Sequence, residues 1–133
     1  MQTVKMTFNL TNIIAVGLGG FFGAIGRFYI GVEIVKYFPH EVPFATLTVN
    51  VVGSFIIGLL IALFLTYTPS VALKAFLVTG FLGALTTYST FAMESYILLN
   101  NHFWYGILNI FLNVFGTIIA AGSGYKLISY LIK

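Results

Sequence analysis

Long apolar runs separated by short polar segments make up most of this chain. Residues 6–26, 42–73, 75–93 and 95–125 contain no Asp, Glu, Lys or Arg. About 20 apolar residues, rising about 1.5 Å each, cross the roughly 30 Å hydrocarbon core of a bilayer. Each run is long enough to do so, and the pattern predicts a multi-pass membrane protein.

The apolar runs are predicted to be helices. Lipid offers the backbone no hydrogen-bond partners, so a spanning segment is either a helix or a strand of a closed barrel. A barrel needs more and shorter segments, in which apolar and polar residues alternate, so these four long apolar runs do not form one. We predict one all-α domain covering residues 1–133, with Pro69 in the first turn of its third helix. The four helices are expected at residues 10–35, 44–65, 71–99 and 103–132.

Composition excludes several classes of protein. With 59% apolar and only 7% charged residues, the chain cannot cover a water-soluble surface. A net charge of +3 is too small to indicate a nucleic-acid partner. The absence of cysteine excludes disulfides, thiolate metal sites and cysteine nucleophiles.

The loops indicate how the chain sits in the membrane. An even number of spans leaves both termini on one side, and the positive-inside rule places that side in the cytoplasm. That side carries Lys5, Lys74, Lys126 and Lys133, against Lys36 on the other. Aromatic residues near the predicted helix ends fit a belt at each membrane interface. They are Tyr37, Phe38, Tyr67, Phe103, Trp104, Tyr105 and Tyr130.

Polar residues inside the spans are the candidate functional groups. Two sets recur every four residues, which places each set on one helix face. They are Thr46, Asn50 and Ser54 in the second helix, and Asn109, Asn113 and Thr117 in the fourth. One interpretation is that these neutral amides and hydroxyls line a path for an anion, whose hydration shell they can replace without a fixed countercharge that would trap it. The alternative is that they form hydrogen bonds that hold the helices together.

Acid–base chemistry is poorly supported. Glu33, Glu41 and Glu94 are scattered, with no second carboxylate or histidine at helical spacing from any of them. His40 and His102 fall in predicted loops on the same side, where we expect them to be solvated. No nucleophile–base pair or metal-ligand cluster is visible, so an enzyme is not expected.

Small residues predict close helix packing in the first and fourth spans. Glycine and alanine spaced by four let two backbones approach closely in a membrane. These residues are Gly19, Gly20, Gly23, Ala24 and Gly26, and then Gly116, Ala120 and Gly124.

The middle of the third span is predicted to leave the helix. Residues 80–94 place two glycines before a Thr-Thr-Tyr-Ser-Thr run, all poor helix formers in an apolar span. Broken backbone at membrane depth lies inside protein or lines a cavity, and its carbonyls are natural cation ligands. The alternative is a continuous helix whose hydroxyls bond back to the preceding turn.

Three stretches of the chain resemble the small four-span fluoride channels known as the Fluc or CrcB proteins. They are residues 19–28, 46–55 and 80–94. The pattern Gly-x-x-Thr-Thr-aromatic-Ser-Thr-Phe-x-x-Glu in the third stretch is very specific, whereas the glycine-rich first stretch alone is weak. Order, spacing and span count agree over nearly the whole chain.

The resemblance implies an antiparallel homodimer of dual topology in the cell membrane, with two pores that passively release cytoplasmic fluoride. By position, Asn50 donates its amide to fluoride, and Tyr88 and Phe91 line the pore with the positive edges of their rings. The remaining pore and vestibule positions are Thr46, Ser89, Thr90, Asn113, Thr117, Arg27 and Glu94. The carbonyls of Gly83 and Thr86 from both subunits are expected to hold a central structural Na⁺.

Some positions differ from the family pattern. Tyr88 stands where the family usually has Phe, which leaves the geometry of the first aromatic position open. Ala45 stands where Gly is frequent, and Asn113 stands in place of a smaller hydroxyl residue.

Two other functions stay open on the sequence. A small multidrug transporter needs a membrane-embedded carboxylate in its first helix, whereas Glu33 lies near the end of that span. A non-transporting accessory subunit would use the glycine faces to bind partner helices.

Overall fold

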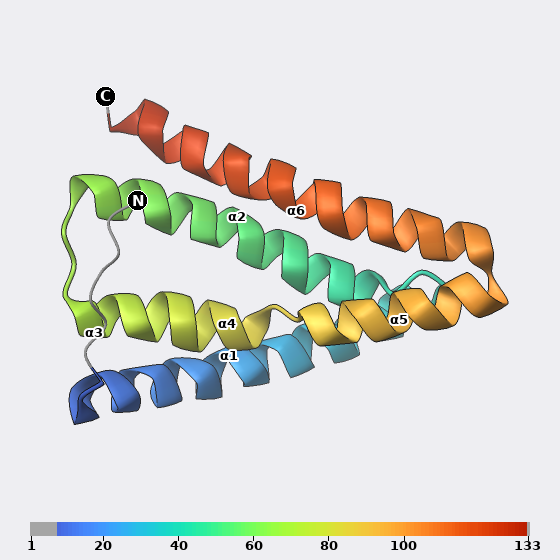
Figure 1. Ribbon diagram of the computed structural model, residues 1–133, viewed down its shortest axis with the longest axis horizontal. Helices are drawn as coiled ribbons and strands as arrows, with labels where there is room; N and C mark the ends of the chain where they lie inside the picture. Colours follow the sequence, from blue (N-terminus) through green and yellow to red (C-terminus); the bar gives the residue numbers. More distant parts are fainter. Residues whose placement is uncertain (1–7, 133) are drawn as a thin grey trace.

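The computed structural model describes residues 8–132, and all of its regular elements are helical. These are α1 (Leu10–Tyr37), α2 (Phe44–Thr66), α3 (Val71–Lys74), η1 (Ala75–Leu82), α4 (Gly83–Leu85), α5 (Tyr88–Asn101) and α6 (Phe103–Leu131). Together they form four spans long and apolar enough to cross a membrane, with α3 to α5 making up the third (Figure 1). The predicted all-α, four-span membrane protein is confirmed.

The third span is broken near its middle, as the sequence predicts. Thr86 (φ −83°, ψ 158°) and Thr87 (φ −149°, ψ 116°) are extended, and they separate α4 from α5 (Figure 1). The Thr86 hydroxyl does bond back to the carbonyl of Leu82 (2.9 Å), but the helix does not continue past it. Before the break, η1 is a π-helix, which the sequence did not indicate and which is rare outside functional regions.

Glycines set how closely the spans approach. α1 packs against η1, and α2 packs along α6, so that α1 and α6 lie on opposite sides of the bundle (Figure 1). A Cβ on Gly23 would collide with the carbonyl oxygen of Phe81, and one on Gly124 would collide with that of Phe55. The predicted close approach is confirmed at these residues and at Gly19.

Other small residues have ordinary contacts. A Cβ on Gly20 would have its nearest neighbour at 3.9 Å, and one on Gly26 or Gly116 at 3.5 Å. Among these predicted glycines, the tight contacts therefore belong to Gly19 and Gly23 of α1 and to Gly124 of α6.

The predicted helix bounds need small corrections. Pro69 does not open the third span, because Ser70 caps it by accepting the N–H of Leu73 (3.2 Å) and Val71 is the first helical residue. α5 continues to Asn101, so that His102 alone separates it from α6.

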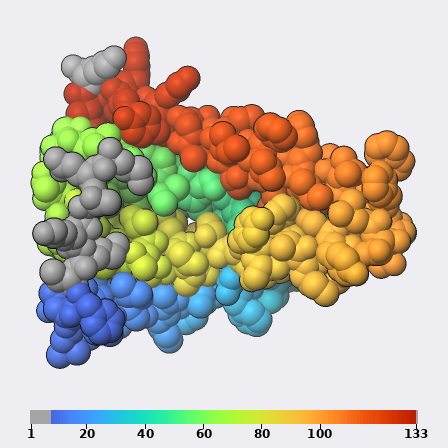
Figure 2. Space-filling model, in the orientation of Figure 1, coloured from blue at the N-terminus to red at the C-terminus, as the bar shows by residue number. Residues whose placement is uncertain are grey.

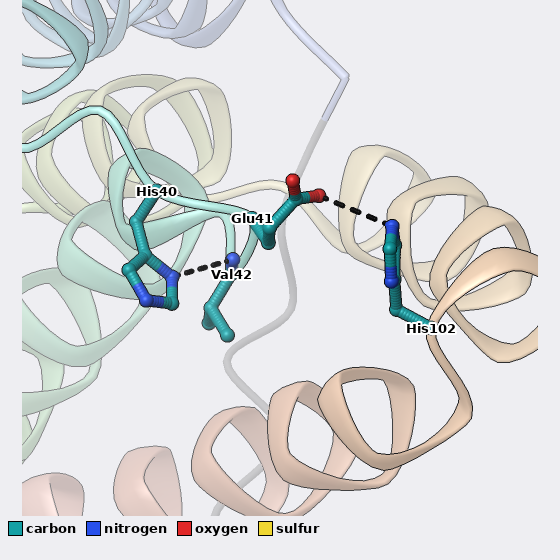
Figure 3. A network of polar contacts seen from close by, with 4 residues as sticks. All are labelled: His40, Glu41, Val42 and His102. Carbon is teal, nitrogen blue, oxygen red and sulfur yellow. Dashed lines mark hydrogen bonds and ion pairs between the residues drawn. The ribbon is translucent and has the colours of Figure 1, made fainter.

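His40 and His102 are exposed, as predicted, but each also has a partner within the chain. His40 Nδ1 accepts the backbone N–H of Val42 (2.9 Å), and His102 Nε2 lies 3.6 Å from the Glu41 carboxylate (Figure 3). The α1–α2 loop and the α5–α6 turn therefore meet at one end of the bundle. His102 and Glu41 can pair because both segments lie at that end.

The opposite end carries the start of α1, the α2–α3 turn and the end of α6 (Figure 1). Lys74 and Lys126 belong to this end, whereas Lys36 lies near the end of α1, at the other end of the bundle. Lys5 and Lys133, which also enter the predicted charge bias, lie outside the described residues. The expected orientation therefore stays a prediction.

Candidate functional site

The break in the third span faces a groove of about 480 Å³ on the surface of the protomer. Figure 2 shows the surface hollowed between α2 and the third span beside the break. None of the residues that line the groove carries a charge. They are Asn50, Gly53, Ser54 and Ile57 of α2, Val78, Leu82 and Gly83 before the break, Thr86, Thr87, Tyr88 and Phe91, and Asn113, Val114, Thr117 and Ile118 of α6.

Asn50 pairs with the broken backbone at two points. Its Oδ1 accepts the N–H of Thr87 (2.8 Å), and its Nδ2 donates to the carbonyl of the same residue (3.1 Å). Both residues are about 8% exposed, so water cannot replace these bonds freely. One amide side chain thus replaces the helical partners that the break removes from Thr87.

A chain of amides continues from Asn50 into the bundle. Asn50 Nδ2 also donates to Asn113 Oδ1 (3.0 Å), and Asn113 Nδ2 donates to both the Oδ1 (3.0 Å) and the carbonyl (3.1 Å) of Asn109. Asn109 is fully buried and donates to Ser95 Oγ (2.9 Å). The two predicted polar ladders therefore meet in one network between α2, α5 and α6.

The break changes the partners of two carbonyls that were predicted as cation ligands. In a continuous helix the N–H of Thr87 would bond to the Gly83 carbonyl and that of Thr90 to the Thr86 carbonyl. Instead, Thr87 donates to Asn50, and Thr90 donates to the Thr87 hydroxyl (3.4 Å). Both carbonyls thus lose their helical donor, and Gly83 is exposed on the protomer surface.

The two predicted aromatic positions lie together at the groove. Phe91 is 8% exposed and Tyr88 is 79% exposed, and their ring centroids are 5.5 Å apart at an interplanar angle of 67°. This edge-to-face arrangement is the one that aromatic quadrupoles favour. Phe91 forms part of the wall, whereas Tyr88 extends outward from it.

Thr46 and Glu94 form a pair one turn beyond the groove. Thr46 is buried and donates its hydroxyl to Glu94 Oε1 (2.8 Å). The other carboxylate oxygen, Oε2, is buried without a hydrogen-bond partner among the described residues. Glu94 is thus a partly satisfied acid next to the polar network.

Besides Thr46 and Glu94, three further predicted site residues do not line the groove. Ser89 and Thr90 are exposed on the first turn of α5. Arg27 lies on α1 in a second, shallow pocket that also includes Lys36. Thr117 does line the groove, with its hydroxyl bonded back to the Asn113 carbonyl (2.6 Å).

Sequence reasoning missed Thr87 and Ser95 as members of the network. The two residues lie four positions before and after Phe91: Thr87 is the extended N-cap of α5, and Ser95 lies one turn after Phe91 on the same helix face. The same spacing rule that identified the ladders on α2 and α6 would have found them, but a phenylalanine interrupts the polar pattern.

Comparison with known proteins points to one family. Residues 14–125 match the family described as CrcB-like protein, Camphor Resistance (CrcB). A protein of Sulfurimonas denitrificans named fluoride-specific ion channel FluC is 52% identical over 123 residues, which cover 91% of this chain and 95% of that protein.

Proteins of the same name from other organisms are nearly as similar. The one from Nitratiruptor is 50% identical over 111 residues, covering 83% of this chain and 86% of its own. The one from Methanococcus maripaludis is 48% identical over 109 residues, covering 80% of this chain and 87% of its own. With a match over most of its length and relatives this similar, the chain belongs to the CrcB-like family.

Proposed function

We propose that this protein is a fluoride-selective channel that lets fluoride leave the cytoplasm passively through the cell membrane. The observation that carries the proposal is the uncharged groove, bordered by amide and hydroxyl side chains, at the break of a membrane-spanning helix. Its relatives at up to 52% identity are named fluoride-specific ion channels, which supports the same substrate here.

The chemistry of the groove suits a small, strongly hydrated anion. Such an ion must exchange its water for protein donors, and it must bind weakly enough to leave again. Amides and hydroxyls supply donors without a fixed positive charge that would trap the ion. Because no side chain that lines the groove is charged, the side chains of the groove itself interact with fluoride through dipoles.

In the proposed pore, Asn50 donates its amide N–H to fluoride, and Phe91 and Tyr88 face the ion with their ring edges. The positive edge of an aromatic quadrupole attracts a dehydrated anion. Asn113 and Thr117 of α6 border the same groove and continue the route. Thr46 and Glu94 lie where the route continues toward the end that carries the α1–α2 loop.

We further propose that two copies assemble as an antiparallel homodimer with one pore on each side. Gly83 and Tyr88 are exposed beside the groove, and Ser89 and Thr90 are exposed on the adjoining turn, where a second copy would cover them. Arg27, which lies away from the groove of its own protomer, would serve at a vestibule. The weak lysine bias is compatible with insertion in both orientations.

A structural Na⁺ fits the carbonyls of Gly83 and Thr86. Unwound backbone inside a membrane protein is a common source of Na⁺ ligands, and both carbonyls lose their helical donors at the break. One protomer supplies only part of a coordination shell, so the proposed ion lies between two copies. A cation there raises the local potential for anions.

Fluoride efflux from liposomes tests the proposed function. We expect purified protein in fluoride-loaded vesicles to release fluoride and to retain chloride, measured with ion-selective electrodes. Vesicles that keep their fluoride while containing correctly inserted protein would contradict the proposal.

Substitutions at the groove test the proposed residues. Asn50→Ala and Phe91→Ile should slow fluoride release at least tenfold, because one removes the donor and the other the ring edge, and about 1.4 kcal/mol corresponds to a factor of ten. Tyr29→Phe, on α1, is the matched control and should leave the rate unchanged. Cross-linking should still give a dimer for every variant, and unchanged release by Asn50→Ala would remove this residue from the pore.

A further inference from the structure

Both amide hydrogens of Asn50 are already engaged. An amide NH₂ group has two hydrogens to donate. In Asn50, Nδ2 donates to the Thr87 carbonyl (3.1 Å) and to Asn113 Oδ1 (3.0 Å). An ion that takes a hydrogen bond from Asn50 must therefore displace one of these acceptors.

The orientation of the amides follows from the main chain. The backbone N–H of Thr87 can only donate, so the atom of Asn50 that faces it at 2.8 Å must be the oxygen. That places Nδ2 of Asn50 toward Asn113, which must in turn present its oxygen. The nitrogen of Asn113 then faces Asn109, where it has the Oδ1 and the carbonyl as acceptors.

The bond to Asn113 is the one that can open. The Thr87 contact consists of two bonds to one peptide segment, so turning Asn50 away would break both of them at the helix break. The Asn113 contact is a single bond between side chains, and Asn113 lines the groove. Rotation of the Asn113 side chain opens it without disturbing the break, although it also breaks the two bonds from Asn113 Nδ2 to Asn109.

We infer that Asn113 is a tethered competitor of fluoride, a residue whose amide oxygen occupies the Asn50 N–H until the ion displaces it. The inference rests on the proposed role of Asn50 as a fluoride donor. Asn113 cannot compensate by donating to the ion in its present position, since its own nitrogen faces Asn109. Asn113 thereby lowers the affinity of the site and favours release of the ion, which conduction requires.

Substitution of Asn113 tests the inference by fluoride binding, measured without transport. Fluoride is titrated into the purified dimer in detergent and followed by ¹⁹F NMR. Asn113→Ala removes the competing oxygen, and the half-saturating fluoride concentration should fall about 2- to 10-fold, the factor that one net hydrogen bond corresponds to. Asn113→Ser, which keeps a short polar group in this buried position, should act in the same direction and serves if the alanine variant does not fold.

Asn113→Asp is the matched counter-variant. It keeps the shape and the acceptor but has no N–H and adds a negative charge, so it should raise the half-saturating concentration. A purely structural role of Asn113 would weaken binding in all the variants. Tighter binding by the Ala or Ser variant together with weaker binding by Asp supports the inference, whereas unchanged or weaker binding by both Ala and Ser overturns it.

Release from liposomes, measured on the same variants, separates this inference from the proposed function. Wild-type protein that conducts fluoride, with no gain in affinity in the Ala and Ser variants, leaves the channel proposal standing and overturns the competitor. Tighter binding by those variants without release by any of them supports the competitor and contradicts the channel. Absence of fluoride binding in every variant overturns both.

Discussion

At the scale of single residues, the loop between α1 and α2 depends on one imidazole. Val42 is 1% exposed, and its N–H finds an acceptor in His40 Nδ1 at 2.9 Å (Figure 3). The ring of His40 also contacts Phe44 and Tyr105, with centroids 5.4 and 5.7 Å away. The pair of His102 and Glu41 is longer, at 3.6 Å, and both side chains are more than half exposed.

His40→Ala should therefore cost more stability than His102→Ala. A buried N–H without a partner costs about 1–3 kcal/mol, whereas an exposed ion pair contributes about 0–1 kcal/mol. Chemical unfolding in detergent micelles, followed by circular dichroism, measures both. Equal losses in the two variants would show that the Val42 N–H is satisfied in another way.

The residue scale also indicates which side chains suit position 50. Its side chain needs an acceptor for Thr87 N–H and a donor for Thr87 C=O at once, which an amide supplies from two separate atoms and an acceptor-only carboxylate does not. Asn50 thus both stabilises the break and is the proposed donor to fluoride.

At the scale of elements, the contact of α1 with η1 depends on a glycine stripe. A Cβ on Gly23 would collide with the Phe81 carbonyl oxygen and lie 3.1 Å from Ala84 Cβ, just before the break. Backbone atoms cannot turn aside as a flexible side chain can. The element that leads into the break is therefore held at a fixed, short distance from α1.

Gly23→Ala should separate these two helices and lower stability by about 1–3 kcal/mol, the usual cost of overpacking. Gly17→Ala on the same helix is the control, since a Cβ there has nothing within 4 Å and alanine is the better helix former. Thermal unfolding of the two variants in detergent gives the comparison. A Gly23→Ala protein as stable as the Gly17→Ala protein would contradict the close contact.

At the scale of the whole molecule, the proposed antiparallel dimer requires that the chain inserts in both orientations. The absence of cysteine makes single-cysteine labelling clean. Thr68 lies in the exposed α2–α3 turn, and Asn101 is exposed at the end of α5, at the other end of the bundle.

In intact cells, a membrane-impermeant thiol reagent should label part of the Thr68→Cys population and part of the Asn101→Cys population. The remainder of each should react only after permeabilisation, because each orientation exposes one end to the outside. Full labelling at one position and none at the other would show a single orientation and would contradict the antiparallel dimer.

The apolar pattern by itself determined the number and nature of the spans. A bilayer leaves the backbone no external partners, so runs of this length had to become helices, and their ends followed to within a few residues. The break near Thr86 was also predictable, because poor helix formers gather there and because such a segment needs internal partners. The sequence also indicated Asn50 and Asn113 as candidate functional residues, because a polar side chain inside a membrane span needs a hydrogen-bond partner.

Only the tertiary structure decided which partners those residues have. Thr87 and Asn113 meet at Asn50 although they are far from it along the chain, because α2 packs against α6 on one side and contacts α4 and α5 on the other. The pairing of His102 with Glu41 likewise depends on the contact between the α1–α2 loop and the α5–α6 turn. Local sequence sets where a polar group lies along a helix, whereas hydrogen bonds of this kind depend on the distance between helices, which side-chain packing sets.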